Sequence, residues 1–383
     1  MRSRLARLVF LTALLHLYIG WRLVPDLPWP PAVIVLCVAW LVISTLLTPL
    51  GVLSRWIESR RVADRLAWAG LLAMGLYSSL LVLTVLRDVL LACGALLGWL
   101  APTLPHLLGL RAITAAAVPL LALFFTVWGF ANARRRAGVV EVDVPIPNLP
   151  AALEGFRIAQ ISDIHVGPTI KRPYLSRIVD AVNALEADLI AITGDLVDGS
   201  VADLSEQTAP LARLAARHGT YFVTGNHEYY SGAAEWTEEL RRLGLNVLQN
   251  EHVVLSHQGA ELVLAGVTDF GAHHFDPAQR SDPLGALRGA PEGAGVRVLL
   301  AHQPRSAPAA QEAGFDLQLS GHTHGGQFFP WNFFVRLQQP FTAGLHRLGK
   351  LWVYTSRGTG YWGPPKRLGA PSEITHLRLV AAA

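Results

Sequence analysis

The stretch Gln160-Ile161-Ser162-Asp163-Ile164-His165 decides how the second part of this chain folds. It has the pattern of an apolar strand that runs directly into an Asp-x-His pair. Side chains two residues apart lie on the same face of an extended chain, so Asp163 and His165 are expected to converge at the carboxyl end of the strand. This spacing suits two ligands of one metal ion, although an isolated pair of this kind is a weak signal.

Four later clusters strengthen the metal interpretation. Each follows an apolar, strand-like run and contains residue types that bind metals through oxygen or nitrogen. The clusters are Thr193-Gly194-Asp195, Gly225-Asn226-His227-Glu228, Ala301-His302-Gln303 and Gly321-His322-Thr323-His324. Five such clusters in order rarely arise by chance, and together they predict a metal site.

The composition divides the chain into an apolar part and a globular part. The 383 residues have a mean hydropathy of +0.34 and are 51% hydrophobic, which is high for a soluble protein. The two cysteines, Cys37 and Cys93, lie in the apolar first third, so a metal site in the globular part must use His, Asp and Asn. The expected organisation is a transmembrane region at 1–135, a linker at 136–152 and a globular domain at 153–383.

Four apolar runs in the first third are long enough to cross a bilayer. The expected spans are 5–24, 32–53, 66–86 and 112–131. Residues 89–101 are too short to cross alone and are expected to extend the third helix. Within these apolar runs, His16 and the Arg87-Asp88 pair are the ionisable groups that could mark a transport path. Both lie close enough to the ends of their runs to be at the membrane–water interface. We therefore expect the helices to serve as an anchor.

The distribution of arginine predicts the orientation of the spans. Ten arginines lie in the amino terminus, the second loop and the exit from the last span, against three in the other two loops. With four spans, this places both termini and the globular domain on the cytoplasmic side of a plasma (inner) membrane, whereas a fifth span through 89–101 would reverse the orientation. Because the arginines flank apolar runs, the net charge of +4 does not indicate nucleic acid, and none is expected as a partner.

The globular part has the pattern of an α/β fold. Strand-like and helix-like segments alternate between residues 157 and 224, which predicts a largely parallel sheet with ligands at the carboxyl ends of its strands. From Asn246 onward the pattern changes to closely spaced strands, and a second sheet is expected. Two sheets packed face to face, with helices outside, would bring two sets of strand ends together along one edge.

The chemistry of the clusters favours two metal ions. Seven carboxylate, imidazole and amide groups are too many for one tetrahedral ion and suit two ions of Mn, Fe or Zn that share a carboxylate, for which Asp195 is the natural bridge. Glycines at 194, 225 and 321 would allow close backbone approach directly before a ligand. Two such ions can activate a water for displacement at phosphorus. His227 could then protonate the leaving group, with Glu228 placed to orient its ring or raise its pKa.

These clusters resemble the signature of the calcineurin-like metallophosphoesterases, and the segments 321–327 and 356–360 are similar to the membrane-anchored bacterial branch that contains YkuE and YaeI. The resemblance implies a two-sheet sandwich flanked by helices. It further implies that one ion is bound by Asp163, His165, Asp195 and His324, and the other by Asp195, Asn226, His302 and His322. In this family pattern His227 is the proton donor, and no ligand position is missing.

The substrate stays open, because this family cleaves monoesters, diesters, pyrophosphates and protein phosphates. The aromatic residues Phe328, Phe329, Trp331, Phe333 and Phe334 suit a membrane interface or an acyl chain, or else pack in the core or against the fourth span. Arg357, together with Lys366 and Arg367, could neutralise a substrate phosphate or lie on a solvated surface.

We expect hydrolysis of a phosphodiester or pyrophosphate bond, with a lipid-linked substrate as the leading hypothesis. The alternatives are a phosphodiesterase that acts on soluble nucleotides, and a transporter or receptor whose phosphoesterase domain is regulatory.

Overall fold

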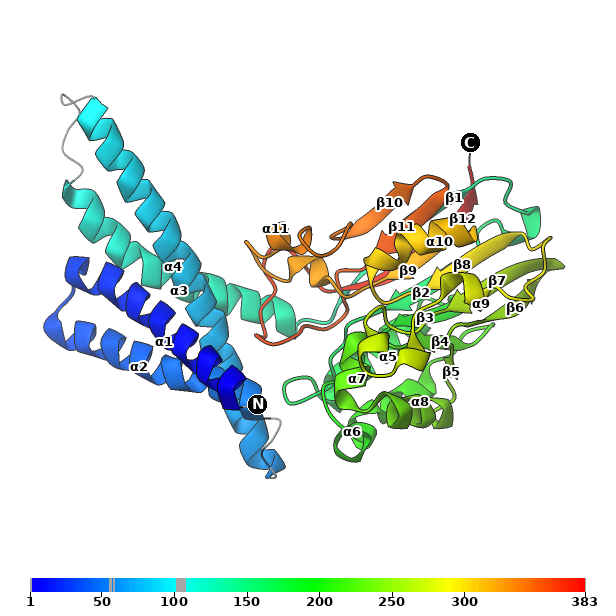
Figure 1. Ribbon diagram of the computed structural model, residues 1–383, viewed down its shortest axis with the longest axis horizontal. Coiled ribbons are helices and arrows are strands. Elements are labelled where there is room, and N and C mark those ends of the chain that lie inside the picture. Colours follow the sequence, from blue (N-terminus) through cyan, green and yellow to red (C-terminus); the bar gives the residue numbers. More distant parts are fainter. Residues whose placement is uncertain (1, 55–56, 58, 101–107, 383) are drawn as a thin grey trace. The chain divides into compact units, whose positions relative to one another are not determined.

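The computed structural model describes residues 2–54, 57, 59–100 and 108–382. The chain divides into two compact units, whose elements are labelled in Figure 1. The helical unit comprises Met1–Asn132 and Gly363–Lys366, and the α/β unit comprises Ala133–Trp362 and Arg367–Ala383.

Four long helices make up most of the helical unit. They are α1 (Arg2–Leu23), α2 (Pro31–Leu53), α3 (Arg60–Leu100) and α4 (Leu108–Arg134), and the short helix η1 (Val24–Asp26) follows α1. By length and composition, α2, α3 and α4 are apolar enough to cross a membrane. In the described part of the chain α1 is helical but is not among these three, so its spanning role stays a prediction.

Helix α3 continues without a break beyond the third expected span, to Leu100. This confirms that residues 89–100 extend the third helix. Ala101, the last residue of the expected extension, and Arg55, counted in the second loop, lie outside the described residues.

Helices α2 and α3 approach each other through glycine. A side-chain carbon added at Gly70 would lie 2.4 Å from Cα of Gly51 and 2.4 Å from the backbone oxygen of Leu47. Such close backbone contact is typical of helices that associate in a membrane, where small residues at the interface allow dense packing.

His16 is buried among the helices of the helical unit. Its ring is 3% exposed, Nδ1 lies 2.8 Å from the backbone oxygen of Thr12, and Nε2 lies 3.0 Å from Oγ of Ser44 in α2. The ring also stacks on Tyr77 of α3 at a centroid distance of 4.2 Å. Because both ring nitrogens have partners, His16 is a packed polar contact that joins three helices.

The α/β unit contains two six-stranded mixed sheets. The first has the order β1-β12-β2-β3-β4-β5, with β1 (Gly138–Ile146), β12 (Glu373–Ala381), β2 (Arg157–Ile161), β3 (Leu189–Thr193), β4 (Thr220–Val223) and β5 (Asn246–Val247). The second has the order β10-β11-β9-β8-β7-β6, with β10 (Gly344–Leu348), β11 (Leu351–Thr355), β9 (Leu317–Ser320), β8 (Val296–Leu300), β7 (Ala260–Gly266) and β6 (Glu251–His257). Strands β2 to β5 are parallel, as are β7, β8, β9 and β11.

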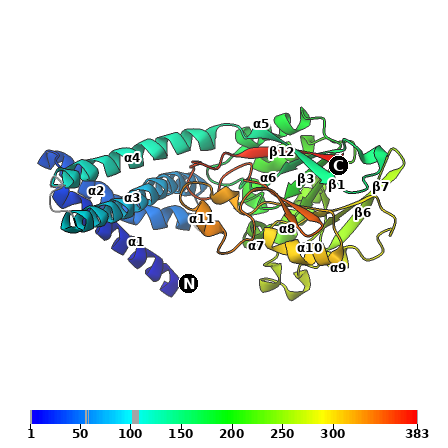
Figure 2. The same cartoon turned by 90° about the horizontal axis from the view of Figure 1, so that it is seen from above.

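The two sheets pack face to face, and helices cover their outer faces (Figures 1 and 2). Between the sheets, Ile158 and Leu189 belong to the same buried cluster as Val298. The helices of this unit are α5 (Arg172–Asn183), α6 (Val201–Thr208), α7 (Asn226–Ser231), α8 (Ala233–Arg242), α9 (Pro283–Ala286), α10 (Ala307–Ala313) and α11 (Asn332–Val335). Helices α5, α6 and α8 contribute to the core outside the first sheet, and α9 and α10 to the core outside the second. The expected two-sheet α/β sandwich is therefore confirmed.

Residues 138–146, which were expected to be part of the linker, form strand β1. This strand pairs in parallel with β12 along its whole length, from Gly138 opposite Glu373 to Ile146 opposite Ala381. An edge strand tolerates Pro145, because one side of its backbone does not need to donate hydrogen bonds. Proline in this segment thus marks the edge of a sheet.

We predict that Gly70→Ala lowers the Tm of the full chain in detergent. The added methyl group would overlap the backbone of α2, and overpacking of this kind costs roughly 1–3 kcal/mol. Thermal unfolding followed by circular dichroism measures the change. The control is Gly98→Ala in the same helix, where nothing lies within 4 Å of the added carbon. An equal loss of Tm in both variants would contradict the close α2–α3 contact.

Candidate metal centre

The potential metal ligands of the five clusters come together at one edge of the α/β unit, where strands of both sheets end. Asp163 and His165 follow β2, Asp195 follows β3, Asn226 follows β4, His302 follows β8, and His322 and His324 follow β9. Three sets of side chains bring ligand atoms within 4.8 Å of one another; these are Asp163/His165/His324, His165/Asp195/His227 and Asp195/His302/His322. Because His165 and Asp195 each belong to two sets, the sets form one continuous centre.

The first part of the centre contains two imidazole nitrogens that face each other. Nε2 of His165 lies 3.0 Å from Nε2 of His324, which lies 3.5 Å from Oδ1 of Asp163. Nδ1 of His165 lies 3.2 Å from the Asp198 carboxylate, to which it can donate its proton. Nε2 then carries a lone pair directed at the same point as the other two ligand atoms, an arrangement that suits a cation.

The second part repeats this arrangement. Nε2 of His302 lies 3.2 Å from Nδ1 of His322 and 3.2 Å from Oδ2 of Asp195. Nδ1 of His302 lies 2.7 Å from the carbonyl oxygen of Thr193, to which it can donate its proton, so Nε2 faces the centre. Burial lowers the pKa of His302, but Asp195 outweighs burial and raises that pKa well above its usual range, so a cation bound at Nε2 would displace the proton there. Oδ1 of Asn226 is buried without a hydrogen-bond partner in the described part of the chain. A buried amide oxygen without a partner is costly, and a cation at this place would satisfy it. The donors present therefore fit a metal.

Five of these residues have a left-handed backbone that side chains rarely adopt. The φ angles are +53° at Asp163, +55° at His165, +52° at Asp195, +69° at His322 and +51° at His324. Each such residue costs of order 1–3 kcal/mol, and strain of this kind persists only where the surrounding structure imposes it, most often at functional sites.

The glycines before the ligands allow close approach, as the sequence predicts. A side-chain carbon at Gly225 would lie 2.2 Å from Oδ1 of Asp195, and one at Gly321 would lie 2.1 Å from Oδ2 of Asp163. Gly194 has a φ of +83°, and a side-chain carbon there would lie 2.7 Å from Nδ1 of His302. Any larger residue at these positions would displace a ligand atom.

The charges of neighbouring groups set the protonation state of the centre. Burial would raise the pKa of the Asp195 carboxyl, but His302 and His227 outweigh burial and hold that pKa well below its usual range. Burial, together with the charge of His302, lowers the pKa of His322 to about 3. Burial, together with Arg367, also lowers the pKa of His324. At neutral pH, His322 and His324 are thus neutral, which is the form of imidazole that binds a metal.

His227 lies beside the centre as an imidazolium. Its Nδ1 lies 2.5 Å from Oδ1 of Asp198, and its Nε2 lies 4.0 Å from Oδ2 of Asp195. Burial lowers the pKa of His227, but Asp195 and Asp198 outweigh burial and raise it to about 9. Asp198 therefore holds the rings of both His165 and His227, a role that sequence reasoning missed. Its position three residues after Asp195 was the available signal.

Glu228 does not orient the His227 ring. Its buried carboxylate accepts hydrogen bonds from the backbone N–H groups of Asp195 at 3.0 Å, Leu196 at 2.8 Å and Gly225 at 2.6 Å. These bonds tie the loop after β3 to the loop after β4. The side chain turns back because Glu228 lies at the third position of α7, from where its carboxylate reaches the backbone N–H of Gly225, the residue before the helix. Its charge also raises the pKa of His227, but less than Asp195 and Asp198 do.

The three basic residues expected near a substrate phosphate differ in their environment. Arg357, whose side chain is 34% exposed, donates from Nη1 to Glu373 at 2.6 Å. Arg367 is buried and donates to the backbone oxygens of Arg357 at 2.7 Å and His324 at 2.9 Å. Lys366 is also buried, so neither it nor Arg367 lies on a solvated surface. Arg367 supports the loop that carries His324.

Comparisons with known proteins show the family of the chain. Residues 156–326 match the family described as "calcineurin-like phosphoesterase". The Campylobacter jejuni protein Cj0846, named an uncharacterized metallophosphoesterase, is 36% identical over 272 residues, which are 70% of this chain and 70% of that protein. YkuE of Bacillus subtilis, also named an uncharacterized metallophosphoesterase, is 30% identical over 244 residues, which are 60% of this chain and 81% of YkuE. The chain belongs to the calcineurin-like metallophosphoesterase family.

A membrane-bound relative is also similar. A Danio rerio protein named "transmembrane protein with metallophosphoesterase domain" is 42% identical over 274 residues, or 68% of this chain. The chain spans 62% of the length of that protein and 63% of its Bos taurus counterpart. Together with the apolar helices α2, α3 and α4, this similarity indicates a membrane protein that contains a metallophosphoesterase domain.

We predict that Asp198→Asn weakens the binding of Mn²⁺ by about 10- to 100-fold, because the carboxylate that orients the His165 ring is lost. Calorimetric titration of the metal-free full chain measures the change. Asp180→Asn is the matched control, since Asp180 is an exposed carboxylate that pairs with Arg213 on the surface. Unchanged affinity in Asp198→Asn would show that His165 does not depend on Asp198.

Proposed function

We propose that this chain is a dinuclear-metal phosphoesterase that hydrolyses a phosphodiester or pyrophosphate bond. The observation that carries this proposal is the convergence of ligand atoms in three sets that are linked through His165 and Asp195. One cation would be held by Asp163, His165, Asp195 and His324, and the other by Asp195, Asn226, His302 and His322. Mn, Fe and Zn all accept such nitrogen and oxygen donors.

In the proposed hydrolysis, His227 and Glu228 have separate roles beside the two cations. When bound, two cations would stabilise the charge of the phosphoryl oxygens and lower the pKa of a water. His227 supplies a proton to the leaving oxygen, because it is protonated at neutral pH and only its Nδ1 is occupied by Asp198. Glu228 keeps the loops of Asp195 and Asn226 together, so the donors are in place before substrate binds.

An exposed aromatic surface supports a lipid-linked substrate. Phe329, Trp331, Phe333, Phe334 and Trp362 are between 41% and 66% exposed, and we call them the aromatic surface. Of the aromatic residues after the last ligand loop, Phe328 alone is buried, at 8% exposure, so the alternative of core packing is wrong for the rest of that group. Exposed aromatic rings are suited to the interface of a bilayer or to an acyl chain.

The aromatic surface borders the metal centre. The ring of Trp362 meets the ring of His227 edge-on, with 5.7 Å between centroids. Gly326, two residues after His324, packs so closely on α11 that a side-chain carbon there would lie 2.2 Å from Cα of Asn332. An acyl chain on this surface would leave the linked phosphate or diphosphate within reach of the centre. We therefore propose a lipid-linked substrate, such as a nucleotide-diphospho-lipid.

We propose that α1 spans the membrane together with α2, α3 and α4. The excess of arginine in the amino terminus, the second loop and the exit from α4 supports a cytoplasmic α/β unit at a plasma (inner) membrane. In this topology the metallophosphoesterase domain would meet its substrate at the inner face of the bilayer.

We predict that the full chain in detergent hydrolyses bis-p-nitrophenyl phosphate with Mn²⁺, and that Asp195→Ala abolishes this activity because it removes a ligand from both cation sites. The release of nitrophenolate measures turnover, and elemental analysis measures bound metal. Asp180→Ala, a change at an exposed carboxylate, is the control. Full activity and full metal content in Asp195→Ala would refute the proposed function.

For the lipid-linked substrate, we predict that the double variant Trp331→Ser and Phe334→Ser raises the KM for a vesicle-borne diphospho-lipid by roughly tenfold or more, because two apolar contacts are lost. Turnover of soluble bis-p-nitrophenyl phosphate is expected to stay unchanged. Leu284→Ser, at a leucine of α9 that is 66% exposed, is the matched control. An equal loss on both substrates would count against the lipid proposal.

A further inference from the structure

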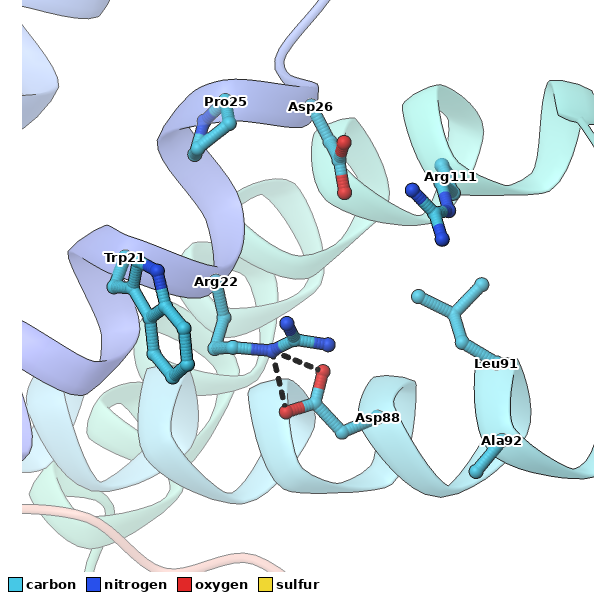
Figure 3. A pocket seen from close by; sticks show the side chains of 8 residues that line it. All are labelled: Trp21, Arg22, Pro25, Asp26, Asp88, Leu91, Ala92 and Arg111. Carbon is cyan, nitrogen blue, oxygen red and sulfur yellow. Dashed lines mark hydrogen bonds and ion pairs between the residues drawn. The ribbon is translucent and has the colours of Figure 1, made fainter.

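The helical unit contains a charged pocket that is separate from the metal centre. The pocket lies where the end of α1 and η1 meet α3 and the start of α4, and its volume is about 410 Å³. Arg22, Asp26, Asp88 and Arg111 line it, and Trp21 lies at its side (Figure 3). Charged groups among apolar helices are costly and therefore point to a function.

Arg87 of α3 holds the elements around this pocket together. Its side chain is 1% exposed, and its guanidinium is paired with the carboxylate of Asp26. It also donates to Oγ1 of Thr114 at 3.0 Å and to the backbone oxygen of Arg22 at 2.8 Å. A buried charge is tolerated only when it is paired and hydrogen-bonded in this way. The ion pair and hydrogen bonds of Arg87 therefore fix the helices around the pocket, and Asp26 balances the charge of Arg87.

Two other arginines present unused donors to the pocket. Nε of Arg22 donates to both oxygens of Asp88, at 3.0 and 2.8 Å, and its terminal nitrogens make no hydrogen bond within the described residues. The guanidinium of Arg111 has no side-chain partner in that part of the chain. Figure 3 shows that the guanidinium groups of Arg22 and Arg111 point toward the same space. Three arginines and two aspartates leave one net positive charge around it.

The residues around the pocket are of the types that occur at the level of lipid head groups. Trp21 is 70% exposed, and Val89 and Leu90, next to Asp88 on α3, are 55% and 51% exposed. Tryptophan and arginine at the ends of apolar helices are typical of the membrane–water interface. Arginine forks suit phosphate oxygens, which accept several charge-assisted hydrogen bonds.

We propose that this pocket binds a phosphate group, that of an anionic phospholipid at the membrane surface, between Arg22 and Arg111. The ligand would occupy the unused donors of both arginines and neutralise the net charge of the pocket. The residues of this pocket belong to the helical unit, whereas the residues of the candidate metal centre belong to the α/β unit. The site would stabilise the helical unit in a membrane that contains anionic lipid.

The test uses the full chain in detergent, titrated with dispersed dioctanoyl phosphatidylglycerol and followed by native mass spectrometry and thermal shift. The wild-type chain is expected to bind one molecule in this pocket, and Arg111→Gln to bind it about tenfold or more weakly, because charge-assisted hydrogen bonds are lost. Arg111→Lys should recover part of the affinity. The control is Arg61→Gln, at an exposed arginine at the start of α3, which should bind as the wild type does. Equal affinity in wild type and Arg111→Gln would overturn the proposal.

A second variant changes the affinity in the opposite direction. Asp88→Asn removes the carboxylate that competes for Arg22 and is expected to tighten binding, whereas damage to the helix packing would weaken it, with a lower Tm in the absence of lipid. Weaker binding in Asp88→Asn with an unchanged Tm would contradict the phosphate assignment.

Two further probes separate the possible sources of the phosphate. Dioctanoylglycerol, which has no phosphate, should not bind in the pocket, and binding as tight as that of the phospholipid would overturn the proposal. Inorganic phosphate that binds with the same dependence on Arg111 would support a phosphate site filled from solution. Binding of the phospholipid alone would support a head-group site.

Discussion

The candidate metal centre depends on one carboxylate, that of Asp195, whose Oδ2 lies 3.9 Å from Nε2 of His165 in the first part of the centre and also faces the second part. Oδ1 of Asp195 accepts the backbone N–H of His227 at 2.8 Å, and Oδ2 lies 3.2 Å from Nε2 of His302. Its own N–H is held by Glu228, and its backbone has a positive φ. A side chain in this position can be shared only if the loops after β3, β4 and β8 end at one place. The two-sheet architecture provides that meeting point.

The side chains of the centre are already oriented before a metal binds. Hydrogen bonds to residues around the centre hold them in place and offset the backbone strain. His165 is held by Asp198, His302 by the carbonyl of Thr193, and the loop of His324 by Arg367. Each contact fixes a ring or its backbone, so little reorganisation is left for metal binding. The strained backbone of five candidate ligand residues is the cost of that arrangement.

Different interactions stabilise the helical unit. Its helices expose leucine, valine and tryptophan side chains, which are costly in water and suited to lipid. Glycine packing between α2 and α3, the buried ring of His16 and the bonds of Arg87 hold the helices together without a hydrophobic driving force. The chain thus combines a candidate metal site, whose side chains are held by hydrogen bonds, with a helix bundle that has few and specific polar contacts.

Local patterns of hydropathy and spacing predicted the apolar helices, the presence of two sheets and the residue types of the centre, because each of these follows from residues close together in the sequence. Only the three-dimensional structure shows that β1 pairs with β12, that Asp198 and not Glu228 orients His227, and that Arg87 joins α3 to α1 and α4. In each case the partner is set by which strand ends and helix ends meet in three dimensions. A hydrogen bond between distant segments depends on that distance and angle, and these leave no local trace in the sequence.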